Sequence, residues 1–212
     1  MSKYGYVGKE SDIPQQAFRA NAGVLGVNEH YNLSQADKLT QYGQLELIRT
    51  QTVSSVSAIT FDDLQDYNIH LFTFNDMHHN QDNTDLFSRV LVNGAEDSGS
   101  SNYGRAHQAM APSYFYEDRD PDLHSLRHIP EIGNATNETL NGWLYMYGAN
   151  DGGSYTFFNQ MFTGIKYDGK TLSNYGYGVY EMKNVLSGIK FYTSGTSNFP
   201  SGTVSLYGVK EY

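Results

Sequence analysis

The stretch "NFPSGTVSLYGV", residues 198–209, decides the fold class of this chain. Val204 and Leu206 stand two positions apart, and Thr203, Ser205 and Tyr207 alternate with them. Successive side chains of a β-strand point to opposite faces, so this pattern predicts a strand that buries one face. Such a strand needs partners, and earlier parts of the chain are expected to supply them.

The preceding stretch "SGIKFYT", residues 187–193, repeats the pattern with Ile189 and Phe191. Residues 193–202, which join the two stretches, are rich in Gly, Ser, Asn and Pro, and these residues favour turns. We therefore expect the two stretches to form a closing antiparallel hairpin.

Similar strand-like runs recur from residue 43 onward, with turn signals between them. The 18 Tyr, 11 Phe and 21 Gly residues also favour strands joined by turns over helices. With 212 residues, the chain is long enough for one main domain with a sizeable core. We predict an all-β protein, an antiparallel β-sandwich of the jelly-roll type. Its nine expected strands lie within residues 44–53, 57–61, 67–74, 86–92, 142–148, 155–167, 176–185, 187–193 and 202–209.

The composition argues against several classes of partner. The formal net charge of −9 and the lack of a basic run disfavour nucleic acid, whose binding needs clustered Lys and Arg. Without Cys, the chain has no disulfide, thiolate metal site or cysteine nucleophile. The opening "MSKYGYVGKESDIP" lacks the apolar core of a signal peptide, and no window is apolar enough for a membrane helix. We expect synthesis in a cytoplasm and no contact with a membrane.

Residues 1–42 are expected to form an N-terminal arm in front of a β-sandwich domain of residues 43–212. The arm has weak periodicity and scattered Gly and Asn, so it offers no core strand of normal length. Within it, "NLSQADKL" is expected to form a turn of helix with Ser34 as N-cap. We predict that the arm contacts neighbouring proteins through these anchors: Tyr4, Tyr6, Ile13, Phe18, Val24, Leu25, Val27 and Tyr31.

Residues 94–141 interrupt the regular spacing of the strands. "AEDSGSSNYGR" is typical of a loop, and the polar run from residue 116 onward is irregular, with at most one short helical turn. A long insertion is uncommon in a compact domain unless it serves contact or function. We therefore expect a loop-rich insertion here, where a partner or ligand touches the domain.

Three groups of His and Asp residues resemble metal ligands, but none forms a complete set. "DMHHNQDNTD", residues 76–85, is interpreted as a solvated loop because its adjacent histidines would diverge. His124 and His128 would share a helix face, yet the Glu of the metalloprotease pattern is missing. "DRDPD", residues 118–122, lacks the Gly and Glu of a calcium loop and is interpreted as an acidic surface turn. We predict no metal site and no cofactor.

The sequence carries no catalytic motif that we can identify. It has no Gly-x-Ser-x-Gly nucleophile elbow, and nothing points to the paired carboxylates of a glycosidase. "GANDGGS", residues 148–154, is interpreted as a hairpin turn because Asp-Gly is a strong signal for tight turns. Tyrosine is enriched at interfaces and at sugar-stacking surfaces, so its abundance favours a binding protein. We expect no enzymatic activity.

The stretch "YGQLELIRTQTVSSVSAITF", residues 42–61, the run "YNIHLFTF", residues 67–74, and the closing stretch at 198–209 carry a resemblance. Together they resemble a widespread group of virion structural proteins from marine and cyanobacterial tailed phages. In that group a variable N-terminal arm leads into strands of this kind. The shared motifs are structural and name no catalytic residues, and residues 94–141 match no pattern of the group.

The resemblance implies a virion structural protein that is made in the host cytoplasm and located in the virion. It would act through protein-protein contacts, as a capsid decoration or cement protein or as a tail or baseplate accessory. Its partners would be copies of itself, as a homotrimer, and other virion proteins such as the major capsid or tail proteins. The alternative is a receptor- or glycan-binding module on the virion surface, in which residues 76–85 and 149–154 hold host-surface glycan. A hydrolase of surface polysaccharide ranks third.

Overall fold

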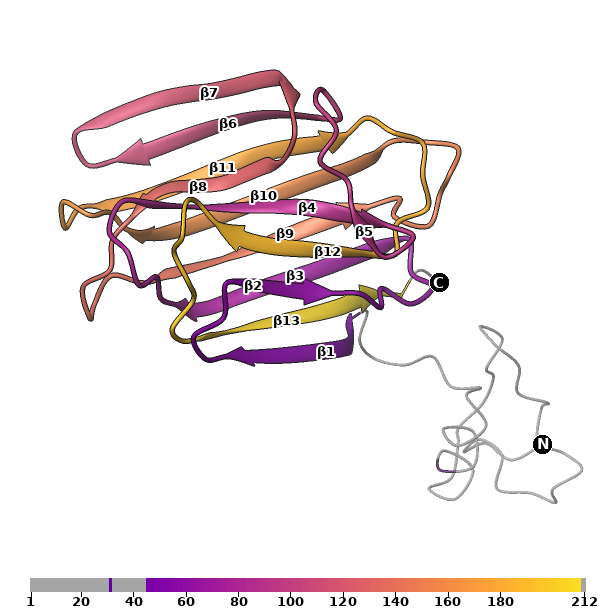
Figure 1. Cartoon of the computed structure of the whole chain (residues 1–212), viewed down its shortest axis with the longest axis horizontal. Coiled ribbons are helices and arrows are strands. Elements are labelled where there is room, and N and C mark those ends of the chain that lie inside the picture. The colour runs from indigo at the N-terminus through magenta and orange to yellow at the C-terminus, as the bar shows by residue number, and fades with distance from the viewer. Residues whose placement is uncertain (1–30, 32–44, 211–212) are drawn as a thin grey trace, which may run out of the picture. The chain divides into compact units, whose positions relative to one another are not determined.

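The computed structural model describes residue 31 and residues 45–210, and the latter contain thirteen strands (Figure 1). Within these described residues, no helix has the length and hydrophobicity needed to cross a membrane. The strands are β1 Leu45–Val53, β2 Ala58–Phe61, β3 Ile69–Met77, β4 Thr84–Val92, β5 Ala95–Glu96, β6 Tyr103–Ala111, β7 Tyr114–Leu123, β8 Leu126–Ile132, β9 Leu140–Tyr147, β10 Thr156–Ile165, β11 Thr171–Tyr180, β12 Gly188–Thr193 and β13 Gly202–Val209.

The strands form two antiparallel sheets that pack face to face (Figure 1). The larger sheet has eight strands in the order β1-β13-β3-β9-β10-β11-β6-β7. The smaller sheet has the order β2-β12-β4-β5, and β8 also pairs with β4. This architecture confirms the predicted all-β antiparallel sandwich.

The alternation of β10 shows why these sequences form two-faced strands. Phe158 and Phe162 are buried between the sheets, whereas Phe157 and Met161 point outward and are exposed. Because both faces carry aromatic or long apolar side chains, burial alone does not explain the outward ones. Their role depends on what lies outside the sheet.

Five phenylalanines join the two sheets at the centre of the sandwich. Phe72, Phe74 and Phe162 come from the larger sheet, and Phe61 and Phe191 come from the smaller one. The ring of Phe191 meets those of Phe72 and Phe74 edge-on, with centroids 5.4 and 4.9 Å apart. This is the geometry that aromatic pairs prefer. Phe191 is therefore a contact point through which β12 is attached to the opposite sheet.

The stretch that predicted the fold is the strand β13, and its alternation is confirmed. Val204 and Leu206 are fully buried, while Ser205 and Tyr207 point outward. β13 pairs with β1 on one side and with β3 on the other. The last strand thus completes the larger sheet.

The predicted hairpin between β12 and β13 is wrong, because these strands lie in different sheets. Residues 194–201 cross from one sheet to the other. Phe199 in this connection is fully buried, and its backbone exchanges two hydrogen bonds with Val56. The apolar residues of β12 and β13 therefore enter the common core from opposite sheets, which a hairpin within one sheet would not allow.

The prediction of a loop-rich insertion at residues 94–141 is also wrong for most of its length. This segment holds β5, β6, β7 and β8, and it ends in the start of β9. β6 and β7 pair over nearly their full length and extend the larger sheet beyond β11. β7 is the edge strand of that sheet, which explains why charged residues and Pro121 are tolerated in it.

"DRDPD" lies within β7 and forms neither a calcium loop nor a surface turn, so that interpretation is corrected. Asp118 accepts hydrogen bonds from Arg105 Nε at 3.0 Å and from Arg127 Nη2 at 2.6 Å, and Arg127 also pairs with Asp85. Burial alone would raise the pKa of Asp118, but the hydrogen bonds from Arg105 and Arg127 lower it to about 2. This network ties β7 and β6 of one sheet to β8 and β4 of the other.

We expect Asp118→Asn to lower the free energy of unfolding by about 2 kcal/mol, between the values for exposed and fully buried ion pairs. The reason is that the guanidinium groups of Arg105 and Arg127, which are 11% and 25% exposed, would lose the carboxylate that they share. Urea unfolding followed by circular dichroism measures the change. Asp62→Asn, which breaks the exposed pair with Arg49, is the control and should have a much smaller effect. Equal effects of the two substitutions would contradict the assignment.

A hydrogen-bonded polar cluster also lies between the sheets. His128 Nε2 is 2.8 Å from Ser88 Oγ, and the other ring nitrogen contacts Gln160 Oε1. Gln160 and Asn174 both donate to the backbone carbonyl of His128, and Gln160 Nε2 lies 3.2 Å from His107 Nε2. Burial lowers the pKa of His128 to about 4 and that of His107 to about 3. Both imidazoles are therefore neutral at pH 7.

Candidate functional site

The outward side chains of the larger sheet form a surface that we call the outer face. Because the strands are in register, these side chains line up in rows across the sheet. The outward residues on β13, β3, β9, β10 and β11, in that order, are Val209, Ile69, Tyr147, Phe157 and Val179 in one row, Tyr207, Leu71, Tyr145, Asn159 and Tyr177 in the next, and Ser205, Thr73, Trp143, Met161 and Tyr175 in the third.

The outer face exposes large aromatic and apolar side chains to solvent. Leu47 at the β1 edge, Phe157 and Tyr177 are 56%, 52% and 57% exposed. Trp143 and Tyr147 flank Tyr145 along β9, with ring centroids 5.6 and 6.0 Å from that of Tyr145. Contiguous exposed apolar area of this kind is typical of interaction sites.

The outer face also lacks charge over six strands. Among the described residues, the outward positions of the paired registers on β1, β13, β3, β9, β10 and β11 hold no Asp, Glu, Lys or Arg. Thr, Ser and Asn make up the polar row at one end, for example Thr203, Asn141 and Thr163. In a chain with a net charge of −9, a neutral face of this extent sets one side of the molecule apart.

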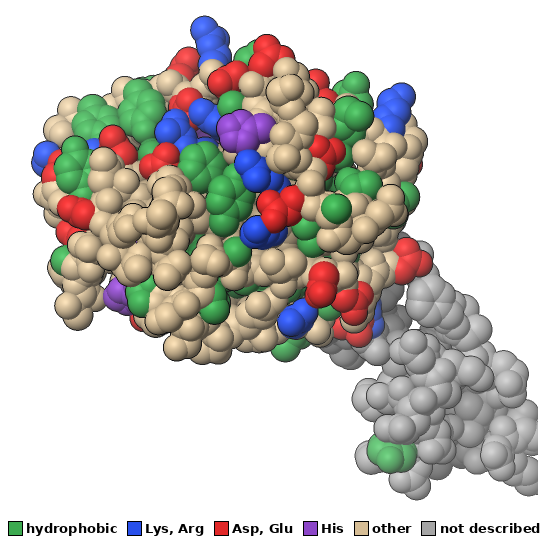
Figure 2. Space-filling model, in the orientation of Figure 1, with side chains coloured by type: hydrophobic (Ala, Val, Ile, Leu, Met, Phe, Trp, Pro, Cys, Tyr) green, Lys and Arg blue, Asp and Glu red, His purple; other side chains and the backbone are tan. Residues whose placement is uncertain are grey.

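The outer side of the smaller sheet has the opposite character. Lys190 and Arg89 both pair with Glu96, and Arg89 also lies over the ring of Tyr192, 5.1 Å from its centroid. Figure 2 shows acidic and basic side chains among hydrophobic ones on the side where β4 and β12 lie in front in Figure 1. This side resembles an ordinary solvated surface, so the outer face is the stronger candidate for binding.

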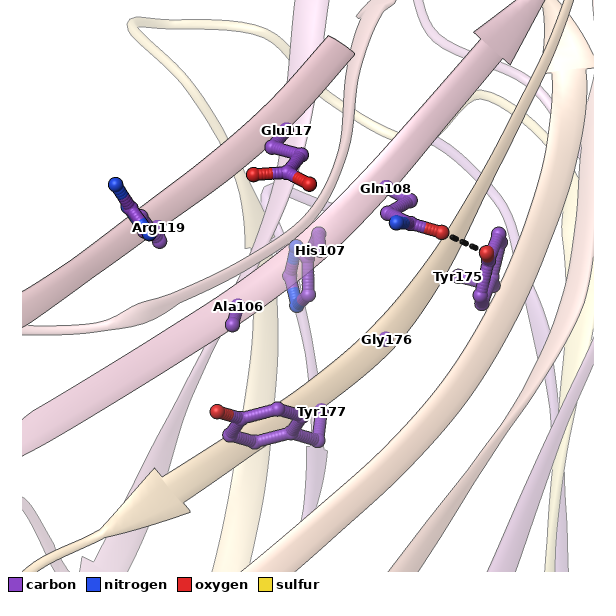
Figure 3. A pocket seen from close by; sticks show the side chains of 8 residues that line it. All are labelled: Ala106, His107, Gln108, Glu117, Arg119, Tyr175, Gly176 and Tyr177. Atoms are coloured by element: carbon purple, nitrogen blue, oxygen red, sulfur yellow. Dashed lines mark hydrogen bonds between the residues drawn. The ribbon is translucent and has the colours of Figure 1, made fainter. Parts of the chain in front are cut away.

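A hollow of about 380 Å³ lies at the β7 end of the outer face, where β11, β6 and β7 run side by side (Figure 3). Its depth comes from Ala106, a small residue that sits in register between Tyr177 and Arg119. The next row is made of Tyr175, Gln108 and Glu117. The hollow therefore combines two tyrosine rings with three planar polar groups.

The backbone beneath the hollow requires glycine. At Gly176, φ is +157°, and a Cβ atom would lie only 2.3 Å from the carbonyl oxygen of Ala106. A side chain there would push β6 away from β11. The glycine thus keeps the two strands close where Tyr175 and Tyr177 flank the hollow.

The predicted arm anchors Tyr4, Tyr6, Ile13, Phe18, Val24, Leu25 and Val27 lie outside the described residues, as does the helical turn expected near Ser34. Tyr31 is described, and its side chain is 64% exposed. The role of the arm therefore stays a prediction.

Residues 76–85 comprise the end of β3, the connection to β4 and the start of β4, so only part of the segment is a loop. The two adjacent histidines differ: His78 Nε2 lies 3.5 Å from Asp76, whereas His79 is buried against Phe199. Neither ring nitrogen of His79 has a hydrogen-bond partner among the described residues, and burial lowers its pKa to about 4. Across residue 31 and residues 45–210, no group of three or more His, Asp or Glu is arranged to hold a metal ion.

His124 and His128 do not share a helix face, because His128 lies on β8 and points into the core, while His124 is exposed in the turn before that strand. Residues 148–154 connect β9 to β10, which pair antiparallel, so the predicted hairpin turn is confirmed. The outer face was not located from the sequence, although its signal is present in the alternating aromatic residues of "LYMY" and "TFFNQMF".

Comparisons with protein families, with curated proteins and with solved structures found no match, and the resemblance to phage virion proteins therefore stays a prediction.

Proposed function

We propose that this chain is a virion structural protein that acts through protein-protein contacts and assembles with copies of itself through the outer face. The observation that carries the proposal is the extent of the uncharged, aromatic surface over six strands. The resemblance at residues 42–61, 67–74 and 198–209 supports the virion role, as capsid decoration or as a tail or baseplate accessory.

The charge distribution favours a second copy as the occupant of the outer face. Each copy carries a net charge of −9, so contact between two copies is least unfavourable through a surface that brings no like charges close together. Interface cores are depleted of charged residues and enriched in Tyr, Trp, Phe and Met. Trp143, Tyr145, Phe157 and Met161 supply that composition near the middle of the sheet.

Asn159→Asp tests this interface. Asn159 is exposed and lies in register between Tyr145 and Tyr177, so a carboxylate there meets water in a single copy. Between copies it would be buried without a partner, at a cost of several kcal/mol. At micromolar concentration we expect the wild type to be an oligomer, and specifically a trimer. We expect the dissociation constant of the variant oligomer to be at least about 100-fold higher than that of the wild type.

Light scattering and sedimentation equilibrium measure the mass of the wild type and of the Asn159→Asp variant in solution. Asn137→Asp makes the same change at an exposed loop position and should leave the mass unchanged. A wild-type monomer, or an Asn159→Asp variant with the wild-type mass, would overturn self-association through this face. Mass spectrometry and electron microscopy of purified particles of a phage that encodes this chain test its place in the virion, and its absence from those particles would overturn that role.

A further inference from the structure

The hollow between β11, β6 and β7 differs in chemistry from the rest of the outer face. It contains a carboxylate, Glu117, and a guanidinium group, Arg119, both on β7, whereas the outward positions of the paired registers from β1 to β11 carry no charge. Among the described residues, neither side chain makes a hydrogen bond or an ion pair. Within residues 45–210, both groups are therefore available to a ligand.

The third planar polar group, Gln108, is held in place from one side. The hydroxyl group of Tyr175 donates a hydrogen bond to Gln108 Oε1, as the dashed line in Figure 3 marks. This bond orients the amide, so its NH₂ group remains available as a donor. Tyr177, on the other side of Ala106, presents a ring that is 57% exposed.

The spacing of these groups suits a small ring-shaped ligand. β11 and β7 are two strand spacings apart, about 10 Å, with Ala106 between them. Glu117 and Arg119 are two residues apart on β7, about 7 Å along the strand. A ligand in the hollow can thus lie against an aromatic ring and reach one acceptor and two donors at its edge.

We propose that this hollow binds a neutral saccharide. The apolar face of a sugar ring would stack on Tyr177, and its hydroxyl groups would donate to Glu117 and accept from Arg119 and the Gln108 amide. One negative and one positive side chain give the site no net charge, so neither an anionic nor a cationic ligand is favoured. A purely apolar ligand would leave both charged groups without partners.

This inference does not rest on the proposed self-association. The polar groups of the hollow, Glu117, Arg119 and Gln108, lie on β6 and β7 outside the six uncharged strands, and only Tyr175 and Tyr177 of β11 belong to both surfaces. The hollow gives the glycan-binding alternative a location different from residues 76–85 and 149–154, where the sequence analysis placed it. Saccharide binding and oligomer mass are separate measurements, so either proposal can fail without the other.

The test uses the full chain and a set of neutral oligosaccharides built from glucose, galactose, mannose and N-acetylglucosamine. Saturation-transfer NMR and titration calorimetry with each sugar detect binding with a Kd of about 1 mM or tighter. We expect at least one of these sugars to bind. Glu117→Gln and Tyr177→Ala should each weaken that binding at least about tenfold. Losing a hydrogen bond to a charged group, or a contact with an aromatic ring, typically lowers affinity by about this factor.

Tyr155→Ala is the matched control, because Tyr155 is 40% exposed and stands beside residues 149–154, the rival location. It should leave the affinity unchanged, and all variants should keep the wild-type melting temperature. The proposal is overturned if no sugar of the set binds. It is equally overturned if Tyr155→Ala abolishes binding while Glu117→Gln and Tyr177→Ala do not affect it.

Discussion

Phe191→Ala is expected to lower the free energy of unfolding by about 3–5 kcal/mol, the usual cost of removing a fully buried phenylalanine. The Phe191 ring has no exposed area and contacts Phe72 and Phe74 of the opposite sheet. The surrounding strands are held by their pairings, so the cavity cannot collapse fully. Urea unfolding monitored by tyrosine fluorescence measures the loss, which is a large fraction of the stability of a typical domain.

Phe115→Ala is the matched control for this substitution. Phe115 is the same residue type but is 57% exposed on the edge strand β7. Its removal should cost less than about 1 kcal/mol, as is usual for exposed positions. If both variants lose the same stability, the phenylalanine cluster does not hold the sheets together.

The strands with a clear period of two could be predicted from the sequence, and the segment of residues 94–141 could not. In β13 and β10, buried apolar residues alternate regularly, and the pattern needs no knowledge of partners. In β7, Asp and Pro at adjacent positions favour a turn when considered alone. Pro121 and its Asp neighbours are compatible with a strand because β7 is an edge strand. Asp118 of the same strand is tolerated because Arg105 and Arg127 neutralise it.

The candidate binding surface was hidden from sequence reasoning for a different reason. The number of tyrosines is visible in the sequence, but which of them share a face depends on the register between strands. Asn159 is next to Tyr145 and Tyr177 only because β9, β10 and β11 pair in the observed register. The hollow likewise needs Ala106 to fall between Tyr177 and Arg119, which come from strands far apart in the sequence.

The stability of the domain is expected to fall steeply between pH 6.5 and pH 5. Burial lowers the pKa of His79 and His128 to about 4 and that of His107 to about 3. Well above pH 6.5, the pKa of an unfolded histidine, these imidazoles are neutral in both the folded and the unfolded chain, so they add no pH dependence there. Below it the unfolded chain takes up protons that the folded chain excludes, which destabilises the fold by about 2 kcal/mol per histidine at pH 5.

Protonation of carboxylates also changes the stability, but at lower pH, so it can be distinguished from the effect of the histidines. The pKa of Asp118 is lowered to about 2, so its contribution to stability is present above its unfolded pKa of 3.8 and is lost as the pH falls toward 2. A loss of stability that is already large at pH 5 therefore reports on the histidines. Urea unfolding at intervals from pH 7.5 to pH 4.5 measures it.

His79→Leu removes one of these contributions, to which His70 adds a fourth because burial also lowers its pKa. His79 packs on Phe199, and its ring nitrogens have no hydrogen-bond partner among the described residues, so an apolar side chain of similar size should be tolerated at pH 7. Between pH 6.5 and pH 5, we expect the variant to lose about 1.5 kcal/mol less stability than the wild type. His124→Gln, a change at an exposed histidine, should leave the pH dependence as in the wild type. If the wild type is equally stable at pH 7.5 and pH 5, the buried histidines are not held neutral and this account of the core is wrong.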